Sequence, residues 1–274
     1  MPRRLRHGLF LPPFNELSRP QLLVELAQSA EASGWDGFFL WDHVLRRPDE
    51  APEVADPFIS LAAVASATAT IRIGTMVTPL VRRRPQVLCR QVVTLDHLSS
   101  GRVTHGLGLG VDTTGELSKF GELLDERERG DLLDEGAALL AEMMTGEEVS
   151  HEGRYFVCDR VRFLPGPVQS PRIPLWLGSR GRAPGLRSLR RAARYDGCFL
   201  IDADLPALER AVGVICEVRQ SLEGFDLAVI DDGSELPLDK AEALGATWAM
   251  RRFRPDHPVA EVVRAAARGP SLSP

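Results

Sequence analysis

The sequence predicts an α/β fold, a TIM (β/α)8 barrel, and two observations support this prediction. Short apolar runs alternate with helical patterns, and each strand–helix pair repeats after roughly thirty residues, as expected of a parallel sheet. One run, residues 37–41, is wholly apolar and ends abruptly at Asp42-His43, which is typical of a strand buried on both faces. A doubly wound sheet of about six strands is the alternative that this pattern leaves open.

Eight segments are predicted as strands because they are apolar runs bounded by turn residues or prolines. The first ends at Pro12-Pro13, the third ends at Thr78-Pro79, and a turn at residues 99–102 leads into the fourth. The predicted strands comprise residues 6–11, 37–41, 71–77, 103–109, 173–177, 198–201, 227–230 and 247–250.

Helices are predicted between these strands from their start signals. Ser18 and Gln21 fit a capping box with Pro20 in the first turn, and Asp56 precedes a second helix that begins at a proline. Asp204 is predicted to cap a later helix. The eight predicted helices end near residues 34, 69, 98, 146, 195, 218, 244 and 267.

The alternation of strands and helices is interrupted between strands four and five. An amphipathic helix that ends at Gly146 is followed by β-branched and aromatic residues at 149–163, which predict a short hairpin. The regular pattern resumes at Ile173. We interpret the interruption as an insertion into one barrel, and residues 1–274 as a single domain, because no Pro- or Ser-rich linker divides the chain.

Composition narrows the functional classes. The net charge of −5 argues against a nucleic-acid binder. The four cysteines lie far apart and no two histidines have His-x-x-x-His spacing, so we predict no metal site and reduced thiols. No apolar run approaches the length that spans a membrane. We therefore expect a cytoplasmic protein without membrane contact.

The predicted strand exits hold candidate functional residues, because side chains just past the carboxyl ends of barrel strands face the active site. His43 is suited to proton exchange near neutral pH, and Asp42 could fix its tautomer. The alternative is a strand-end histidine satisfied by the backbone. Gly106, Gly108 and Gly110 would let a flat ligand approach the backbone closely, although their spacing is not that of a dinucleotide-binding fingerprint.

The segment after the fifth predicted strand, Leu177-Gly178-Ser179-Arg180-Gly181-Arg182, is a further candidate. Small residues and two arginines there could bind an anionic group through backbone N–H and guanidinium donors. An ordinary turn with solvent-facing arginines is the alternative. The run Arg82-Arg83-Arg84 is similarly interpreted as a solvated face.

Several motifs, taken together, resemble the bacterial-luciferase-like oxidoreductases, and the resemblance covers nearly the whole chain. The motifs include Trp41-Asp-His43, Gly74-Thr-Met-Val-Thr-Pro79, Leu95-Asp-His-Leu-Ser-Ser-Gly-Arg102, Gly106-Leu-Gly-Leu-Gly110, Glu116-x-x-x-Phe-Gly121, Gly153-Arg-Tyr-Phe156 and Pro174-Leu-Trp-Leu-Gly178.

The resemblance implies a TIM barrel that binds FMN or the deazaflavin coenzyme F420 at the carboxyl ends of its strands. Family members that use F420 commonly carry an Asp-His pair at the end of strand two, matched here by Asp42 and His43. Many also have a non-prolyl cis peptide at the end of strand three, which aligns with Met76–Val77 and would back the cofactor ring.

The same resemblance places further residues at the cofactor. Thr78 would lie near the ring edge, and Arg180 would help to hold the anionic tail, together with Arg182 and the run at residues 82–84. Relatives often have an aromatic residue at the position of Val111 and a second glycine at that of Ser179. The residues expected to approach the ribityl chain and phosphate are Gly108, Gly110, Gly178 and Ser179.

We therefore predict an oxidoreductase that transfers a hydride between F420, or FMN, and a small organic substrate. His43 would give or take the accompanying proton, with Asp42 orienting it or closing off the strand. Glu116 is either a second acid or base, or a cap of the polar segment around it. Phe10 and Phe14 are candidate apolar lining residues, as are Trp41 and Phe120.

Three alternatives stay open. One is an FMNH2-dependent monooxygenase that uses oxygen and a separate flavin reductase, although the chain lacks a long late insertion that could shield the reaction from water. Another is a flavin-binding barrel without turnover. The least favoured is a phosphate-binding isomerase or lyase, because residues 231–234 after strand seven are acidic. From the family we also expect a homodimer.

Overall fold

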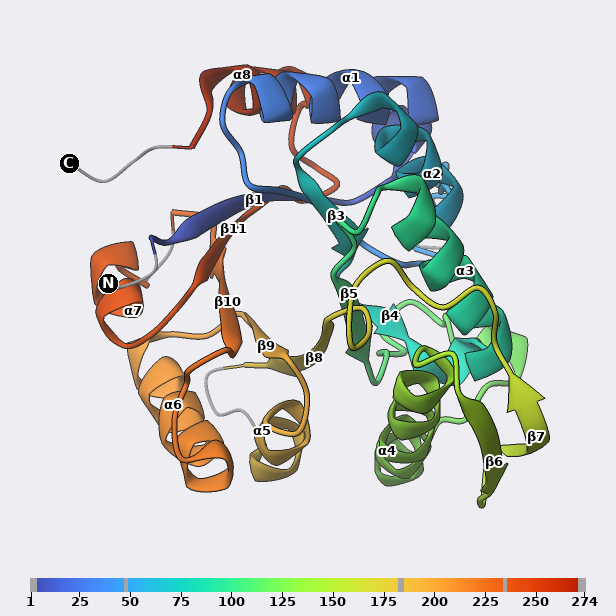
Figure 1. Ribbon diagram of the computed structural model, residues 1–274. Helices are drawn as coiled ribbons and strands as arrows, with labels where there is room; N and C mark the ends of the chain where they lie inside the picture. The colour runs from blue at the N-terminus through green and yellow to red at the C-terminus, as the bar shows by residue number, and fades with distance from the viewer. Residues whose placement is uncertain (1–3, 47–48, 182–184, 234–235, 271–274) are drawn as a thin grey trace.

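Nine parallel strands within residues 4–46, 49–181, 185–233 and 236–270, which the computed structural model describes, form one sheet that curls back on itself (Figure 1). Their order along the sheet is β3-β2-β1-β11-β10-β9-β8-β5-β4. The strands are β1 (Arg6–Leu11), β2 (Gly37–Leu40), β3 (Arg72–Thr75), β4 (Thr78–Pro79), β5 (His105–Gly108), β8 (Leu175–Arg180), β9 (Gly197–Ile201), β10 (Asp226–Asp231) and β11 (Trp248–Arg252).

The two ends of the sheet meet, which closes the barrel. Ile73 on β3 forms a parallel bridge with Val103, just before β5, and the N–H of Thr104 donates to the carbonyl of Ile73 at 2.9 Å. β4 pairs with the end of β5, so β3 and β4 together occupy one position in the wall. Eight positions result, which confirms the predicted TIM barrel over the doubly wound sheet.

The lower part of the barrel is filled by large side chains set against glycines. Phe39, Trp176 and Trp248 are fully buried, with ring centroids 5.7–6.1 Å apart. A Cβ on Gly37 would lie 2.4 Å from the ring of Phe39, and one on Gly197 would lie 2.4 Å from the indole of Trp176. Small and large residues therefore interdigitate and close the barrel beneath its functional face.

The described part of the chain also forms eight α-helices, which surround the sheet (Figure 1). Two predicted caps are confirmed, because Asp56 accepts from the N–H of Ile59 at 2.9 Å and Asp204 accepts from that of Ala207 at 3.0 Å. The helices are α1 (Pro20–Ala32), α2 (Pro57–Ala67), α3 (Pro85–Leu98), α4 (Glu126–Met143), α5 (Leu186–Ala192), α6 (Leu205–Arg219), α7 (Leu238–Ala243) and α8 (Val259–Arg268).

The predicted capping box at the start of α1 is wrong. Arg19 occupies the N-cap position without a side-chain cap, and Pro20 follows at the first helical position. The hydroxyl of Ser18 donates instead to Glu53 at 3.3 Å. Ser18 belongs to a short 3-10 helix, η1 (Asn15–Ser18), and this extra turn displaces it from the cap.

Most observed strand boundaries differ from the predicted ones by a few residues, and two of the differences bear on the functional residues. The third strand ends at Thr75 rather than at residue 77, because a cis peptide joins Met76 to Val77 and the chain resumes pairing only at β4. The fifth strand runs on to Arg180, which pairs with Ile201 on β9. Ser179 and Arg180 therefore lie in β8 and not in the turn that follows it. Arg182 lies outside the described residues.

The insertion between the fourth and fifth barrel strands is smaller than predicted. α4 packs against α3 and against the 3-10 helix η2 (Leu80–Arg82), and its Leu140 is buried in the shell between sheet and helices, so it belongs to the outer ring. The inserted part is the predicted hairpin, formed by β6 (Glu148–Glu152) and β7 (Val157–Arg162). None of the helices in the described ranges has the length and apolar character that crossing a membrane requires.

Candidate active site

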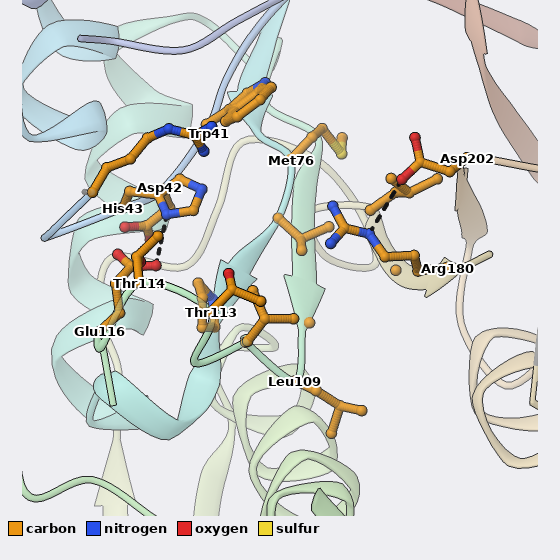
Figure 2. Close-up of a pocket in the computed structure, with 18 of the residues that line it drawn as sticks. Trp41, Asp42, His43, Met76, Leu109, Thr113, Thr114, Glu116, Arg180 and Asp202 are labelled. Carbon is orange, nitrogen blue, oxygen red and sulfur yellow. Dashed lines mark hydrogen bonds and ion pairs between the residues drawn. The ribbon is translucent and has the colours of Figure 1, made fainter. Parts of the chain in front are cut away.

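A cleft of about 1430 Å³ opens at the carboxyl ends of the barrel strands. Figure 2 shows His43 and Glu116 on one side of it and Arg180 with Asp202 on the other, with Met76 between them. The cleft gathers most of the residues that the sequence singled out, namely Asp42, His43, Met76, Val77, Gly108, Gly110, Glu116, Gly178, Ser179 and Arg180.

His43 is paired with Glu116 rather than with its neighbour in the sequence. Its Nδ1 lies 2.6 Å from a carboxylate oxygen of Glu116 (Figure 2). The carboxylate accepts, so Nδ1 carries the hydrogen and Nε2 is left with its lone pair in the neutral ring. Within the described part of the chain Nε2 makes no hydrogen bond, and the side chain is 20% exposed in the cleft. The imidazole is thus oriented to exchange a proton through Nε2.

Glu116 is almost fully buried and is held by the backbone as well as by His43. Its second oxygen accepts from the N–H groups of Val44 and Leu45 at 2.7 and 3.2 Å. Burial by itself raises the pKa of the Glu116 carboxyl, but the hydrogen bonds from His43 and Val44 outweigh it and hold the pKa below its ordinary value. Glu116 therefore stays ionised and serves as the fixed partner of His43, 73 residues away in the chain.

Asp42 does not orient His43, so that expectation is wrong. Its buried carboxylate accepts two hydrogen bonds from Arg83, at 2.9 and 3.0 Å, and Arg82 donates to its carbonyl oxygen at 2.8 Å. The alternative, in which Asp42 closes off the strand, describes the structure. Arg82 and Arg83 are correspondingly not a solvated face, because their side chains are only 5% and 16% exposed. Both are directed at Asp42 and not at a cofactor tail.

The floor of the cleft is formed where the wall changes from β3 to β4. The predicted cis peptide between Met76 and Val77 is confirmed, and both side chains line the cleft. A Cβ on Gly108 would lie 2.5 Å from Cγ2 of Val77, and one on Gly178 would lie 3.3 Å from Cγ1. The glycines on β5 and β8 therefore make room for Val77, which presents an apolar surface flanked by bare backbone.

Thr78 lies behind this floor. Its side chain is fully buried and its hydroxyl is 2.8 Å from that of Thr75, which in turn is 3.1 Å from Nδ1 of His105. Thr78 is absent from the described residues that line the cleft. The family resemblance implies a position near the ring edge, whereas the Thr78 side chain is held in the hydrogen-bonded group with Thr75 and His105.

One end of the cleft collects hydroxyl and guanidinium donors from β8, α4 and α5. The hydroxyls of Ser179 and Ser188 are 2.7 Å apart, and Ser188 also donates to the carbonyl of Gly185. Arg129, which is 8% exposed, donates to the carbonyl oxygens of Leu124 and Leu123. This end has the donor chemistry that an anionic group requires.

The opposite wall is made by the exits of β8 to β11, and its charges are paired. Arg252 donates to both Asp202 and Asp232. Arg180 lies 3.6 Å from Asp202 (Figure 2), and Arg254 lies 3.7 Å from Asp232. Arg180 is therefore turned toward the β9 side of the cleft and away from the end that holds Ser179 and Ser188.

The wall beside His43 is aromatic. Phe10, Phe14 and Trp41 line the cleft as expected, with the Phe14 and Trp41 rings 5.6 and 5.8 Å from the imidazole centroid. Phe120 was expected there too, but it lies in η3 (Ser118–Phe120), is 59% exposed and is not among the described lining residues. Val111 does line the cleft and is 39% exposed.

Sequence reasoning missed Arg252, Asp202, Ser188 and Arg129. A signal for the first existed, because Trp248 and Met250 point into the barrel and the alternation of β11 continues to Arg252. The others follow strands or lie on helices, where the sequence carries no comparable signal. Among the described residues, no group of three or more His, Cys, Asp or Glu side chains is placed to hold a metal ion.

Comparison with known proteins agrees with this geometry. A family model described as luciferase-like monooxygenase matches residues 5–226. An F420-dependent glucose-6-phosphate dehydrogenase of Nakamurella multipartita is 30% identical over 247 residues, which cover 86% of this chain and 70% of that protein. An F420-dependent hydroxymycolic acid dehydrogenase of Mycobacterium tuberculosis is 30% identical over 203 residues, and the match covers 74% of this chain and 54% of that protein.

Solved structures share the fold. An F420-dependent secondary alcohol dehydrogenase, in complex with an F420-acetone adduct, superposes with a TM-score of 0.73 at 21% identity, covering 82% of this chain and 68% of that one. A monooxygenase from Streptomyces bottropensis has a TM-score of 0.76 at 18% identity and covers 96% of both chains. At these identities the likeness concerns the barrel alone.

Proposed function

Because the chain belongs to the luciferase-like monooxygenase family, we propose that it is an oxidoreductase that transfers a hydride between coenzyme F420 and a small organic substrate. The observation that carries the proposal is the open Nε2 of His43 beside the apolar floor of the cleft. A hydride transfer to or from an alcohol carbon also moves a proton at the oxygen, and His43 is placed to handle that proton.

The residues of the cleft fit a cofactor with a flat ring and an anionic tail. Met76 and Val77 offer an apolar surface, and the bare backbone at Gly108 and Gly178 leaves its flanks open. The tail would be held by the hydroxyls and guanidinium groups at the other end of the cleft. In that role we propose Ser179, Ser188 and Arg129, with Gly110 on the path between, whereas Arg180 is turned toward Asp202 and is not part of this group.

When bound, F420 or FMN supplies a ring atom that accepts or gives a hydride. In the oxidation direction, Nε2 of His43 accepts the proton of the substrate hydroxyl while the electron pair of the C–H bond departs with its hydrogen, and a carbonyl forms. Glu116 holds Nδ1–H and stabilises the imidazolium that results. The aromatic wall of Phe14 and Trp41 keeps water from the reacting centre. Asp42 is a positioning residue that anchors the exit of β2.

The decisive test is a titration of the purified protein with F420 and with FMN, each oxidised and reduced, followed by fluorescence. We expect micromolar binding of F420 and much weaker binding of FMN, since the named relatives are F420-dependent. Tight binding of FMN together with oxygen consumption would support the monooxygenase with a separate flavin reductase instead. Binding of F420 without turnover of any alcohol or ketone would support a binding protein. Failure of both to bind contradicts the proposal.

We also propose a homodimer. Ile59 on α2 and Val87 on α3 are 70% and 54% exposed, and these helices pack against each other. Large exposed apolar side chains on adjoining helices favour burial against another chain. Sedimentation of the wild type and of Ile59→Asp measures this directly, and a wild type that sediments as a monomer contradicts it.

A further inference from the structure

We propose that the substrate is an uncharged alcohol or carbonyl compound, and that Arg252, held by Asp202 and Asp232, is the residue that sets this specificity by making the wall opposite His43 unable to bind anions. This inference rests on the proposed function, because it concerns the substrate end of the same cleft.

The position of Arg252 suggests a substrate contact at first sight. It ends β11, lines the cleft and is 9% exposed, so its guanidinium lies at a depth where an anionic substrate group could be bound. A buried arginine in a cleft is a common receptor for phosphate and carboxylate groups. Whether it can serve as one depends on what already occupies its donors.

Two carboxylates occupy the two terminal nitrogens of Arg252, while its buried Nε has no hydrogen-bond partner among the described residues. Nη1 of Arg252 donates to Asp202 and Nη2 donates to Asp232. Asp202 follows β9 with a φ of +57°, a left-handed conformation that aspartate tolerates better than most residues. This conformation places the Asp202 carboxylate on the cleft side of the wall, between Arg252 and Arg180. Asp202 lines the cleft, so an incoming anion would meet its carboxylate before it could reach the guanidinium.

The neighbouring arginine at this wall is engaged in the same way. Arg254 lies 3.7 Å from Asp232, and Asp256 lines the cleft beside it. Arg180, Arg252 and Arg254 line the cleft together with Asp202 and Asp256. Asp232 is not among the described lining residues but pairs with Arg252 and Arg254, so three arginines are balanced by three aspartates. A wall with balanced charge offers a dianion no net attraction, but it can still form hydrogen bonds with hydroxyl groups.

The wall around the reacting atom adds the second half of the inference. Phe10 and Trp41 both line the cleft with ring centroids 5.4 Å apart, so the substrate space next to His43 is bounded by aromatic rings. The buried ring of Phe199 supports Phe10 edge-on at 5.2 Å. Ile201 continues this surface toward Asp202. A substrate that fills the space between the two walls therefore has an apolar body, a reacting oxygen at His43 and uncharged polar groups toward Arg252.

The test measures anion binding with the cofactor end already filled. The protein is saturated with F420, and binding of inorganic phosphate and of glucose 6-phosphate is then followed by calorimetry for the wild type, Asp202→Asn, Asp202→Asn/Asp232→Asn and Arg252→Met. We expect no binding to the wild type up to roughly 10 mM, and at least a tenfold gain in phosphate affinity for the double variant. Adding Arg252→Met to the double variant should remove the gain.

The binding results distinguish a blocked Arg252 from one that binds anions. Submillimolar binding of phosphate or glucose 6-phosphate by the wild type, lost in Arg252→Met, would make Arg252 an anion receptor and overturn the inference. Equal phosphate affinities of the wild type and both aspartate variants would also overturn it. Asp202 is 44% exposed, so Asp202→Asn is the variant that answers the question if the double variant does not fold. If F420 does not bind, the proposed function fails, and the same phosphate titrations without cofactor still show whether Arg252 is blocked.

Discussion

Two histidine–glutamate pairs of nearly the same construction lie in different regions of this molecule. At the barrel mouth, Nδ1 of His43 is 2.6 Å from Glu116, and in the hairpin Nε2 of His151 is 3.1 Å from Glu135. The two histidine side chains are 20% and 25% exposed. Burial opposes the shift in both carboxyls, yet hydrogen bonds from the histidine and from the backbone lower both pKa values.

In both pairs the glutamate also accepts hydrogen bonds from backbone N–H groups. Glu116 accepts from two consecutive N–H groups after β2, whereas Glu135 accepts from three, those of Arg154, Tyr155 and Phe156 in the turn between β6 and β7. A carboxylate that gathers free N–H groups of a turn is a structural device in either place. The two pairs differ in where they lie, because of the two histidines only His43 lines the cleft. A histidine–glutamate pair is therefore no functional signal until the fold has placed it.

The largest expected difference between the two pairs is in turnover. His43→Ala should lower kcat by about 10²- to 10⁴-fold, the range for loss of a general acid or base, with little change in the Kd of F420. The matched variant His151→Ala should leave kcat within about twofold, because it removes the same contact outside the cleft. Steady-state kinetics with coenzyme titration of both variants measures this. Equal kcat values for His43→Ala and wild type would remove His43 from the mechanism.

A second difference concerns what anchors each region. Asp42→Asn should destabilise the protein by about 3–5 kcal/mol, because it leaves the buried guanidinium groups of Arg82 and Arg83 without their carboxylate. Near the hairpin, Arg154→Ala breaks an ion pair with Glu128 whose partners are 63% and 39% exposed, and should cost under about 1 kcal/mol. Urea unfolding of both variants provides the comparison. A loss of under about 1 kcal/mol for Asp42→Asn would show that the pair is not an anchor.

The third difference between the two pairs is in how much each glutamate makes the stability of the protein depend on pH. Because the pKa of Glu116 is lower in the folded protein than its ordinary value of 4.5, its stabilising effect is complete above that value and is lost as the pH falls through the lower, folded-state pKa. Glu116→Gln should thus cost about 1–3 kcal/mol at pH 7, and the gap from wild type should shrink below about pH 4.5. Glu135→Gln should show the same trend with a smaller amplitude, because Glu135 is more exposed. A gap that does not change with pH would contradict the assignment.

The smallest expected effect is that of adding one methyl group, as a Gly→Ala substitution, in the cleft or in the hairpin. Gly108→Ala would place Cβ 2.5 Å from Val77, which must shift, and we expect the affinity for F420 to fall about tenfold, equivalent to about 1.4 kcal/mol. Gly153→Ala, in the hairpin, would place Cβ 2.2 Å from a carboxylate oxygen of Glu135 on α4 and should leave the affinity for F420 unchanged. Fluorescence titration of both variants is the measurement. Unchanged affinity in Gly108→Ala would mean that Val77 does not back the ring.

The features that the sequence predicted well are those that depend on neighbouring residues. The apolar run before Asp42 became β2, the aspartates at positions 56 and 204 became helix caps, and the hairpin formed where β-branched residues surround Glu152-Gly153. Resemblance to a family supplied the cis peptide and the cofactor class, which no local pattern in this chain would have predicted.

Local hydrogen bonding and apolar periodicity specify the order of strands and helices, the barrel, and the position of His43 at a strand exit, so these features could be predicted from the sequence. The side-chain partners depend on long-range contacts: Glu116 pairs with His43 across 73 residues, Arg83 with Asp42 across 41, and Asp202 with Arg252 across 50. These choices depend on which strands become neighbours around the closed sheet and on their register. Side chains that are far apart in the sequence therefore meet at the carboxyl ends of the strands. The carboxylate nearest to His43 in the sequence, that of Asp42, instead pairs with Arg83.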